Sequence, residues 1–157
     1  YFAWVDTNTK SDYNSSNCAT YEKDIELLRN NGYIDSNGNL TMAHDAARAN
    51  WGSTWRMPTI AEINELLENT TTRWTTCNGV KGRLFTSKQN GKSIFLPAAG
   101  NRFKSSLSFD GGIGFYWSAK SYEYHPVSAC HFYINSDNFA TGTYDRHDGL
   151  SIRPVAE

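Results

Sequence analysis

The side chains best suited to chemistry are four histidines and the acids that accompany the last of them. The histidines are His44, His125, His131 and His147. Asp145, His147 and Asp148 follow one another closely enough to gather a metal ion, because imidazole and carboxylate groups are common metal ligands. A solvated turn explains the same three residues more simply. The metal site therefore stays the minor alternative at this position.

No arrangement typical of catalysis accompanies these residues. The chain has no G-x-S-x-G nucleophile elbow, no H-E-x-x-H helix and no phosphate-binding P-loop. The stretch GGIGFYW (111–117) begins like a dinucleotide-binding loop but lacks the third glycine and a following helix, so it is interpreted as a turn. No nucleophile is paired with a base. The sequence therefore predicts a protein that is not an enzyme and needs no cofactor, with calcium left open.

The cysteines are Cys18, Cys77 and Cys130. An odd and sparse set is not a disulfide framework, although one bridge between Cys18 and Cys77 is an open alternative. No C-x-x-C pair exists, so a zinc site has little support.

Composition narrows the class of protein. The 157 residues suffice for one domain, and the chain is expected to be a fragment of a larger surface protein because it starts at Tyr1. A net charge of −1 gives no electrostatic reason to bind nucleic acid, and the apolar runs are too short to insert into a membrane. Aromatic residues make up 14% of the chain beside many Asn, Ser, Thr and Gly. Loops of that composition often bind ligands.

Helical patterns are confined to the first half of the chain. Residues 20–32 carry Ile25 and Leu28 at helical spacing, and a second helix is expected over about 41–50, capped by Thr41. The clearest helix covers about 59–69, where Thr59 and Glu62 have the spacing of a capping box.

Strand patterns dominate the second half. The expected strands are 1–5, 79–87, 92–100, 114–119, 129–135 and 150–155, with a turn at Asn90-Gly91. Helices first and short strands later predict a single loop-rich α+β domain with antiparallel pairing.

Several of these stretches together resemble a known family. The segments WRMPTIAEINELL, GVKGRLFTSKQNGKSIFLPAAGNR, GFYWSA and GLSIRPV, with YFAWVDTNTKSDY as the opening, are similar to the Fibrobacter succinogenes major paralogous domain. The resemblance implies a C-type lectin-like fold of the kind shared with formylglycine-generating enzymes, in which two main helices pack on short antiparallel strands and both chain ends join the sheet. The catalytic cysteine pair of those enzymes and the sugar-binding triplets of calcium-dependent lectins have no counterpart here. The fold alone therefore brings neither activity with it.

The resemblance extends to the variable proteins of diversity-generating retroelements. Those systems rewrite adenines in a C-terminal segment, so that Asn codons turn into codons for many residues but never for Lys, Glu, Gln, Met or Trp. These five types occur 22 times in the chain and nowhere in residues 124–156. The segment still keeps residues expected in the scaffold, such as Phe132, Ile152 and Pro154. A rigid scaffold that carries exchangeable aromatic and polar side chains is how an antibody paratope works.

We therefore predict a ligand-binding face whose side chains are mostly exposed on one surface. Its expected members are Phe109, Phe115, Tyr122, Tyr124, His131, Tyr133, Tyr144, Asp145, His147 and Asp148. The expected role is that of an adhesin or receptor-binding module on a cell surface, a pilus or a phage virion, with a protein or glycan of another cell surface as partner. Two alternatives remain: a structural or carbohydrate-binding module without diversification, and a degenerate enzyme of the formylglycine-generating type.

Overall fold

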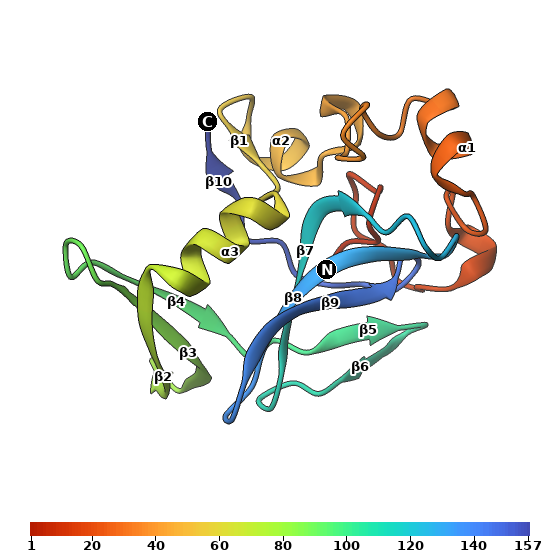
Figure 1. Cartoon of the computed structure of the whole chain (residues 1–157). Helices are drawn as coiled ribbons and strands as arrows, with labels where there is room; N and C mark the ends of the chain where they lie inside the picture. The colour runs from red at the N-terminus through yellow and green to blue at the C-terminus, as the bar shows by residue number, and fades with distance from the viewer.

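The computed structural model describes residues 1–157 and confirms a small α+β fold of mostly antiparallel strands with few helices (Figure 1). The helices are α1 (Ile25–Asn30), α2 (Ala46–Trp51) and α3 (Ile60–Glu68), with short 3₁₀ turns at Ser15–Asn17 and Met42–His44. None of these helices has the length and apolar character that crossing a lipid bilayer requires.

The helix predicted over 59–69 is confirmed in its position and its cap. The Thr59 hydroxyl accepts a hydrogen bond from the Glu62 backbone amide, and the Glu62 carboxylate accepts one from the Thr59 amide. The Arg56 guanidinium also donates two hydrogen bonds of 2.7 and 2.6 Å to the Glu62 carboxylate. This pairing lowers the pKa of Glu62 to about 2. Ile63 is buried on the inner face of the helix. The capping box and this apolar position, both visible in the sequence, therefore determine where α3 lies.

The helix predicted over 41–50 is wrong in its start. Thr41 makes no side-chain cap, and the segment divides into a 3₁₀ turn and α2 at Asp45. The buried Asp45 carboxylate accepts hydrogen bonds from the amides of Ala47, Arg48 and Met57. Because the contact with Met57 comes from outside the helix, a tertiary hydrogen bond decides where α2 begins.

The helix predicted over 20–32 forms only as α1. Asp24 caps it by accepting a hydrogen bond from the Leu27 amide, and Gly32 follows it with a φ of 72°. The residues before Asp24 form turns instead. The carbonyls of Thr20 and Lys23 accept hydrogen bonds from the Arg146 guanidinium.

Two three-stranded antiparallel sheets and two short ribbons make up the rest. One sheet has the order β2 (Thr70–Cys77), β3 (Val80–Ser87), β4 (Ser93–Pro97) and the other β7 (Gly114–Ser121), β8 (Ser128–Ile134), β9 (Phe139–Asp145). The ribbons pair β5 (Asn101–Phe103) with β6 (Ser106–Ser108), and β1 (Trp55–Arg56) with β10 (Val155–Ala156). The sequence predicted the places of β3, β4, β7 and β8 but missed β1, β2, β5, β6 and β9.

The predicted strands at the two ends of the chain form only in part. Phe2 and Leu150 exchange backbone hydrogen bonds of 2.9 and 3.1 Å, which confirms that these two segments lie together. Residues 152–154 have no strand structure, and the pairing resumes only at β10. Two indoles join the N-terminal segment to β7: Nε1 of Trp4 donates to the Ser118 carbonyl at 2.9 Å, and Nε1 of Trp117 donates to the Phe2 carbonyl at 2.8 Å.

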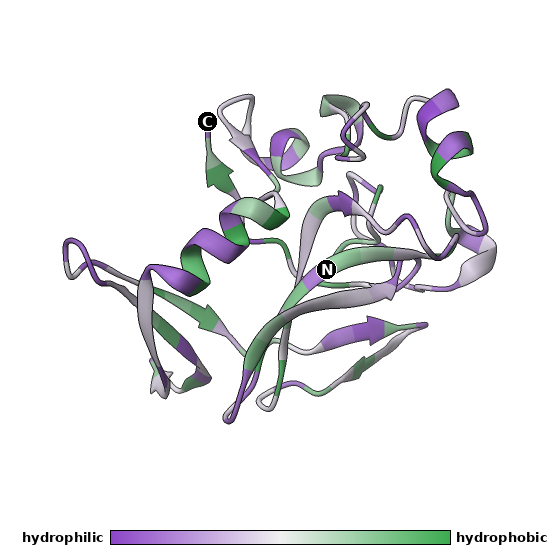
Figure 2. Cartoon of the chain, in the orientation of Figure 1, coloured by the Kyte–Doolittle hydropathy of each residue, from purple (hydrophilic) through white to green (hydrophobic).

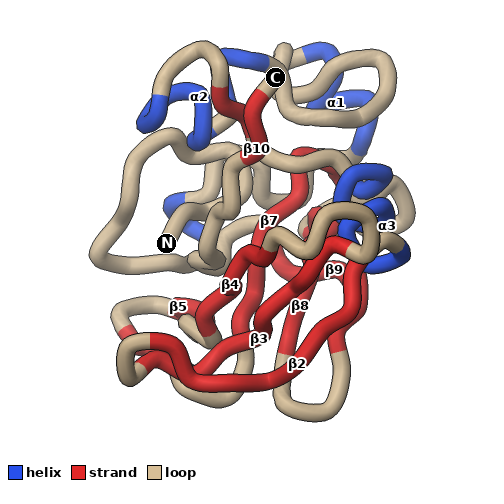
Figure 3. The backbone as a smooth tube through the Cα atoms, turned by 90° about the vertical axis from the view of Figure 1, so that its left-hand side faces the viewer, coloured by secondary structure: helices blue, strands red, loops and turns tan.

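Apolar residues form two cores, one on each side of the sheet β7–β8–β9. Core 1 contains Trp4, Trp117 and Ala129, whereas core 2 contains Phe132 and Ile134 beside α3 and the sheet β2–β3–β4. Figure 2 shows the apolar colour concentrated on these inner strands and on one side of α3. Figure 3, turned by 90°, shows the sheet β2–β3–β4 in front of β7 and β8. The expected burial of Trp117 and Phe132 is confirmed, whereas Ile152 is only partly buried.

The cysteines are free in this fold. Cys18 is buried beside the hydroxyl of Thr20, whereas Cys77 is exposed at the end of β2. The alternative of a Cys18–Cys77 bridge is therefore not realised.

Truncation of Trp117 to Ala should lower the free energy of unfolding by about 3–5 kcal/mol, because it opens a cavity and removes one of the two hydrogen bonds that the Phe2 carbonyl accepts. Trp51→Ala provides the matched control, because that side chain is 48% exposed. Chemical denaturation of both variants measures the difference, and equal losses would contradict the assignment of Trp117 to the core.

Candidate ligand-binding face

Eight aromatic rings, in two groups of ring contacts, make up what we call the aromatic strip. Ring contacts join Phe109 to Phe115 at 6.1 Å, Phe115 to Tyr144 at 5.2 Å, and Phe115 to His131 at 5.8 Å between centroids. His131 continues to Tyr133 at 6.0 Å. The full set is Tyr21, Phe103, Phe109, Phe115, His131, Tyr133, Tyr144 and His147.

The sheet β7–β8–β9 places the centre of the strip. Phe115 and Tyr133 are cross-strand partners, and His131 lies opposite Gly142 of β9. Because strand side chains alternate, these residues share one face while Phe132 and Ile134 point to core 2. Gly142 makes room for the His131 ring, since a Cβ there would approach its Cε1 to 3.0 Å.

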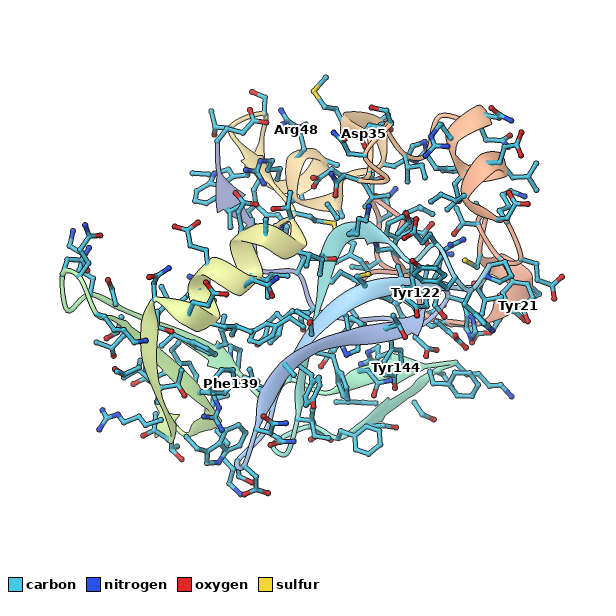
Figure 4. All side chains as sticks on the ribbon, viewed as in Figure 1. Tyr21, Asp35, Arg48, Tyr122, Phe139 and Tyr144 are labelled. Atoms are coloured by element: carbon cyan, nitrogen blue, oxygen red, sulfur yellow. The ribbon has the colours of Figure 1, made fainter.

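The ribbon β5–β6 supplies the other side of the strip. Arg102 and Gly149 exchange two backbone hydrogen bonds of 2.8 Å, which sets Phe103 beside the segment 147–148. The Phe103 and His147 rings lie 6.1 Å apart, and His147 in turn contacts Tyr21 at 5.7 Å. The Asn101 amide donates to the Tyr144 hydroxyl at 3.1 Å, which links the ribbon to β9. Figure 4 shows Tyr144 directly above this ribbon.

The predicted exposure of the binding face is wrong for most of its members. Phe115, His131, His147 and Asp148 are buried, with exposed fractions of 8, 4, 8 and 7%. Tyr122, Tyr133, Tyr144 and Asp145 are partly buried, and only Phe109 and Tyr124 are exposed. The physical reason is that this face of the sheet β7–β8–β9 is the one that packs in core 1: Phe115 belongs to that core, and Tyr133 and Tyr144 pack against it.

The structure also separates part of the predicted face. Tyr122 and Tyr124 contact each other at 5.5 Å but have no ring contact with the strip. Five predicted residues, Phe109, Phe115, His131, Tyr133 and Tyr144, are in continuous ring contact. His147 contacts Tyr21 and Phe103 and has no ring contact with these five residues, and Asp145 and Asp148 are near it in the chain.

Asp145, His147 and Asp148 do not assemble a metal site, because no three His, Cys, Asp or Glu side chains of the structure have a ligating arrangement. The simpler interpretation of a solvated turn is confirmed in the turn, but it is wrong in the solvation, since His147 and Asp148 are buried. Nε2 of His147 lies 3.6 Å from Oδ1 of Asp148.

Burial controls the charges beneath the strip. It raises the pKa of Asp148 to about 7, with a further contribution from the nearby Asp145 charge. Burial lowers the pKa of His131 to about 4 and also lowers that of His147. At neutral pH both imidazoles are therefore uncharged, and Asp148 is divided between its two protonation states.

Sequence reasoning missed three residues of the site: Tyr21, Asn101 and Phe103. Tyr21 was placed in a helix, and Asn101 and Phe103 belong to a ribbon that had no strand pattern of its own. One signal was available for Phe103, because an aromatic residue between Arg102 and Lys104 has no apolar neighbour in the sequence.

Comparisons with protein-family models, curated proteins and solved structures gave no match to this chain.

Replacement of Asp148 by Asn should change the pH dependence of stability in a defined direction. A carboxyl whose pKa is raised from 3.8 to about 7 makes the folded protein bind more protons than the unfolded chain between these values. The free energy of unfolding of the wild type should therefore fall relative to Asp148→Asn, on the order of 3 kcal/mol, as pH rises from 4 to 7. Urea denaturation at several pH values measures this difference, in which the opposite contribution of His131 cancels. A constant difference would contradict the burial of Asp148.

Proposed function

We propose that this chain is a non-enzymatic ligand-binding module that binds a partner through its aromatic strip. The observation that carries the proposal is the exposure of large apolar rings on one hydrogen-bonded framework. Phe103 and Phe109 are 46 and 56% exposed and lie against the buried rings of His147 and Phe115, and Tyr133 and Tyr144 are partly exposed. Exposed aromatic area does not stabilise a monomer, whereas aromatic anchors with polar surroundings concentrate the energy of an interface.

We further propose that the domain has a C-type lectin-like fold and belongs with the Fibrobacter succinogenes major paralogous domain. Support comes from the pairing of Phe2 with Leu150, which joins the chain ends, and from α3 packed on antiparallel strands. The expected role is an adhesin or receptor-binding module at a cell surface or on a phage virion.

Diversification by a retroelement is part of the same proposal. The segment without Lys, Glu, Gln, Met and Trp, residues 124–156, contains β8 and β9, which carry His131, Tyr133 and Tyr144. A reverse transcriptase gene nearby, with a near-repeat of the 3′ coding end that differs only at adenines, would support diversification. A 3′ end without any such repeat would exclude it and leave the binding role standing.

Phe103→Ala and Phe109→Ala should each weaken partner binding by about 1–3 kcal/mol, because a ring at the centre of an interface loses its buried area. Partners are found first by probing arrays of cell-surface proteins and of glycans with the purified domain, and affinity is then measured by calorimetry.

Leu27→Ala is the matched control, since Leu27 is 46% exposed like Phe103 but belongs to α1. All three variants should keep a melting temperature close to that of the wild type. A partner whose affinity falls with Leu27→Ala and not with the two Phe variants would rule out the aromatic strip as the binding face.

A further inference from the structure

Two buried hydrogen-bond acceptors beside the aromatic strip have no donor from the chain. Oδ1 of Asn101 and Oδ1 of Asp148 are both shielded from solvent and have no hydrogen-bond partner. Their residues are only 3 and 7% exposed. A buried acceptor without a donor costs free energy, on the order of 1–3 kcal/mol. Two such acceptors in one surface feature indicate a place where a donor from outside the chain would be stabilised.

The two acceptors belong to the same part of the strip. The Arg102–Gly149 bridge sets β5, with Asn101 and Phe103, alongside the segment that contains Asp148. The Asn101 amide group donates to the Tyr144 hydroxyl. Burial raises the pKa of that hydroxyl, and the nearby charges of Asp148 and Asp145 raise it further. The Asn101 amide, the Asp148 carboxyl and the Tyr144 and Phe103 rings therefore border one site.

The charge of this site is negative and is not neutralised by the chain. Neither Asp145 nor Asp148 forms an ion pair with a lysine or an arginine; the one contact is with the uncharged His147. The nearby cations are engaged elsewhere. Arg146 points to the Trp4 ring, and Arg102 lies over the Tyr1 ring on the other side of β5.

Lys104 is the remaining cation near the site. Its Nζ lies 5.5 Å from the centroid of the exposed Phe103 ring, which is a cation–π distance.

We propose that this part of the strip binds the cationic end of a lysine or arginine side chain presented by a protein partner. The ammonium or guanidinium group donates to the Asn101 and Asp148 oxygens, and the Phe103 and Tyr144 rings contact its aliphatic stem and its charge. Because both oxygens are shielded in the free domain, the cation reaches them only after one of these rings turns aside. The inference rests on the proposed function and narrows its partner to a basic protein surface rather than a neutral glycan.

An NMR titration with n-butylammonium chloride, a probe for the lysine side chain, tests the inference. We expect saturable shifts of the Asn101 side-chain amide and of the backbone amides of Phe103 and Tyr144. The neutral 1-butanol and sodium chloride at equal concentrations should not produce them. Asp148→Asn should weaken butylammonium binding about tenfold or more through loss of the charge-assisted hydrogen bond, whereas Glu65→Gln, which removes the same charge from an exposed position on α3, should not.

A second variant keeps the test independent of Asp148. Phe103→Leu preserves apolar volume but removes the ring face, and it should weaken butylammonium binding several-fold. Affinity should also rise between pH 6 and 8, because the Asp148 carboxyl loses its proton near pH 7. The other groups that face this carboxyl are Asp145, His147 and Tyr144, of which none gains a positive charge in that range.

Equal shifts with 1-butanol, or no saturable shift with butylammonium, would overturn the cation site. With either result, the proposal that the aromatic strip is the binding face still stands if the affinity of an array partner falls with Phe103→Ala and Phe109→Ala.

Discussion

The Arg146 guanidinium is the interaction on which the rest of this structure depends. It is 1% exposed and has no acidic partner. Instead its Nε donates to the Ser128 carbonyl at 2.8 Å, and its Nη1 lies within 3.2 Å of the carbonyls of Thr20, Lys23 and Pro126. These carbonyls come from the loop before α1 and from the connection between β7 and β8. Burial without an anion lowers the pKa of Arg146 to about 10, and the site is held by backbone dipoles and by the Trp4 ring 5.5 Å away.

This one side chain explains why one end of the predicted face is buried. Arg146 follows β9 directly, and its own backbone accepts from the Trp4 amide and donates to the Val127 carbonyl. The residues next to it, His147 and Asp148, are therefore buried beside the ribbon β5–β6, where Arg102 pairs with Gly149. The chain then returns to Phe2 through Leu150. A buried cation thus fixes the end of the strip where the acceptors lie, and the rings of Phe103 and Phe109 remain free at the surface.

Local signals predicted the elements that local contacts determine. The sequence predicted the Thr59–Glu62 capping box because all the donors and acceptors of this motif lie within four residues. The start of α2 was not, because Asp45 is fixed by the distant Met57 amide. Strand β9 was missed for the same reason: Ala140, Gly142 and Thr143 gain their strand structure by pairing with β8. The predicted face included five residues whose rings contact one another, but their burial depends on packing in core 1 between strands far apart in the sequence, which no local pattern indicates.

The alternation of strand side chains sets the limit on how freely the face can change. Along β8, Phe132 and Ile134 are held in core 2, while His131 and Tyr133 point to the strip. Substitution of Tyr133, which is partly exposed, leaves the opposite core untouched. His131 is different, because its ring is buried against Gly142 and a larger or charged side chain there would be desolvated or would push β9 away. The face therefore combines the exposed Phe109, where the side chain can be exchanged, with Tyr133, which packs in part against core 1, and with an inner layer of Phe115 and His131 that keeps the outer rings in place.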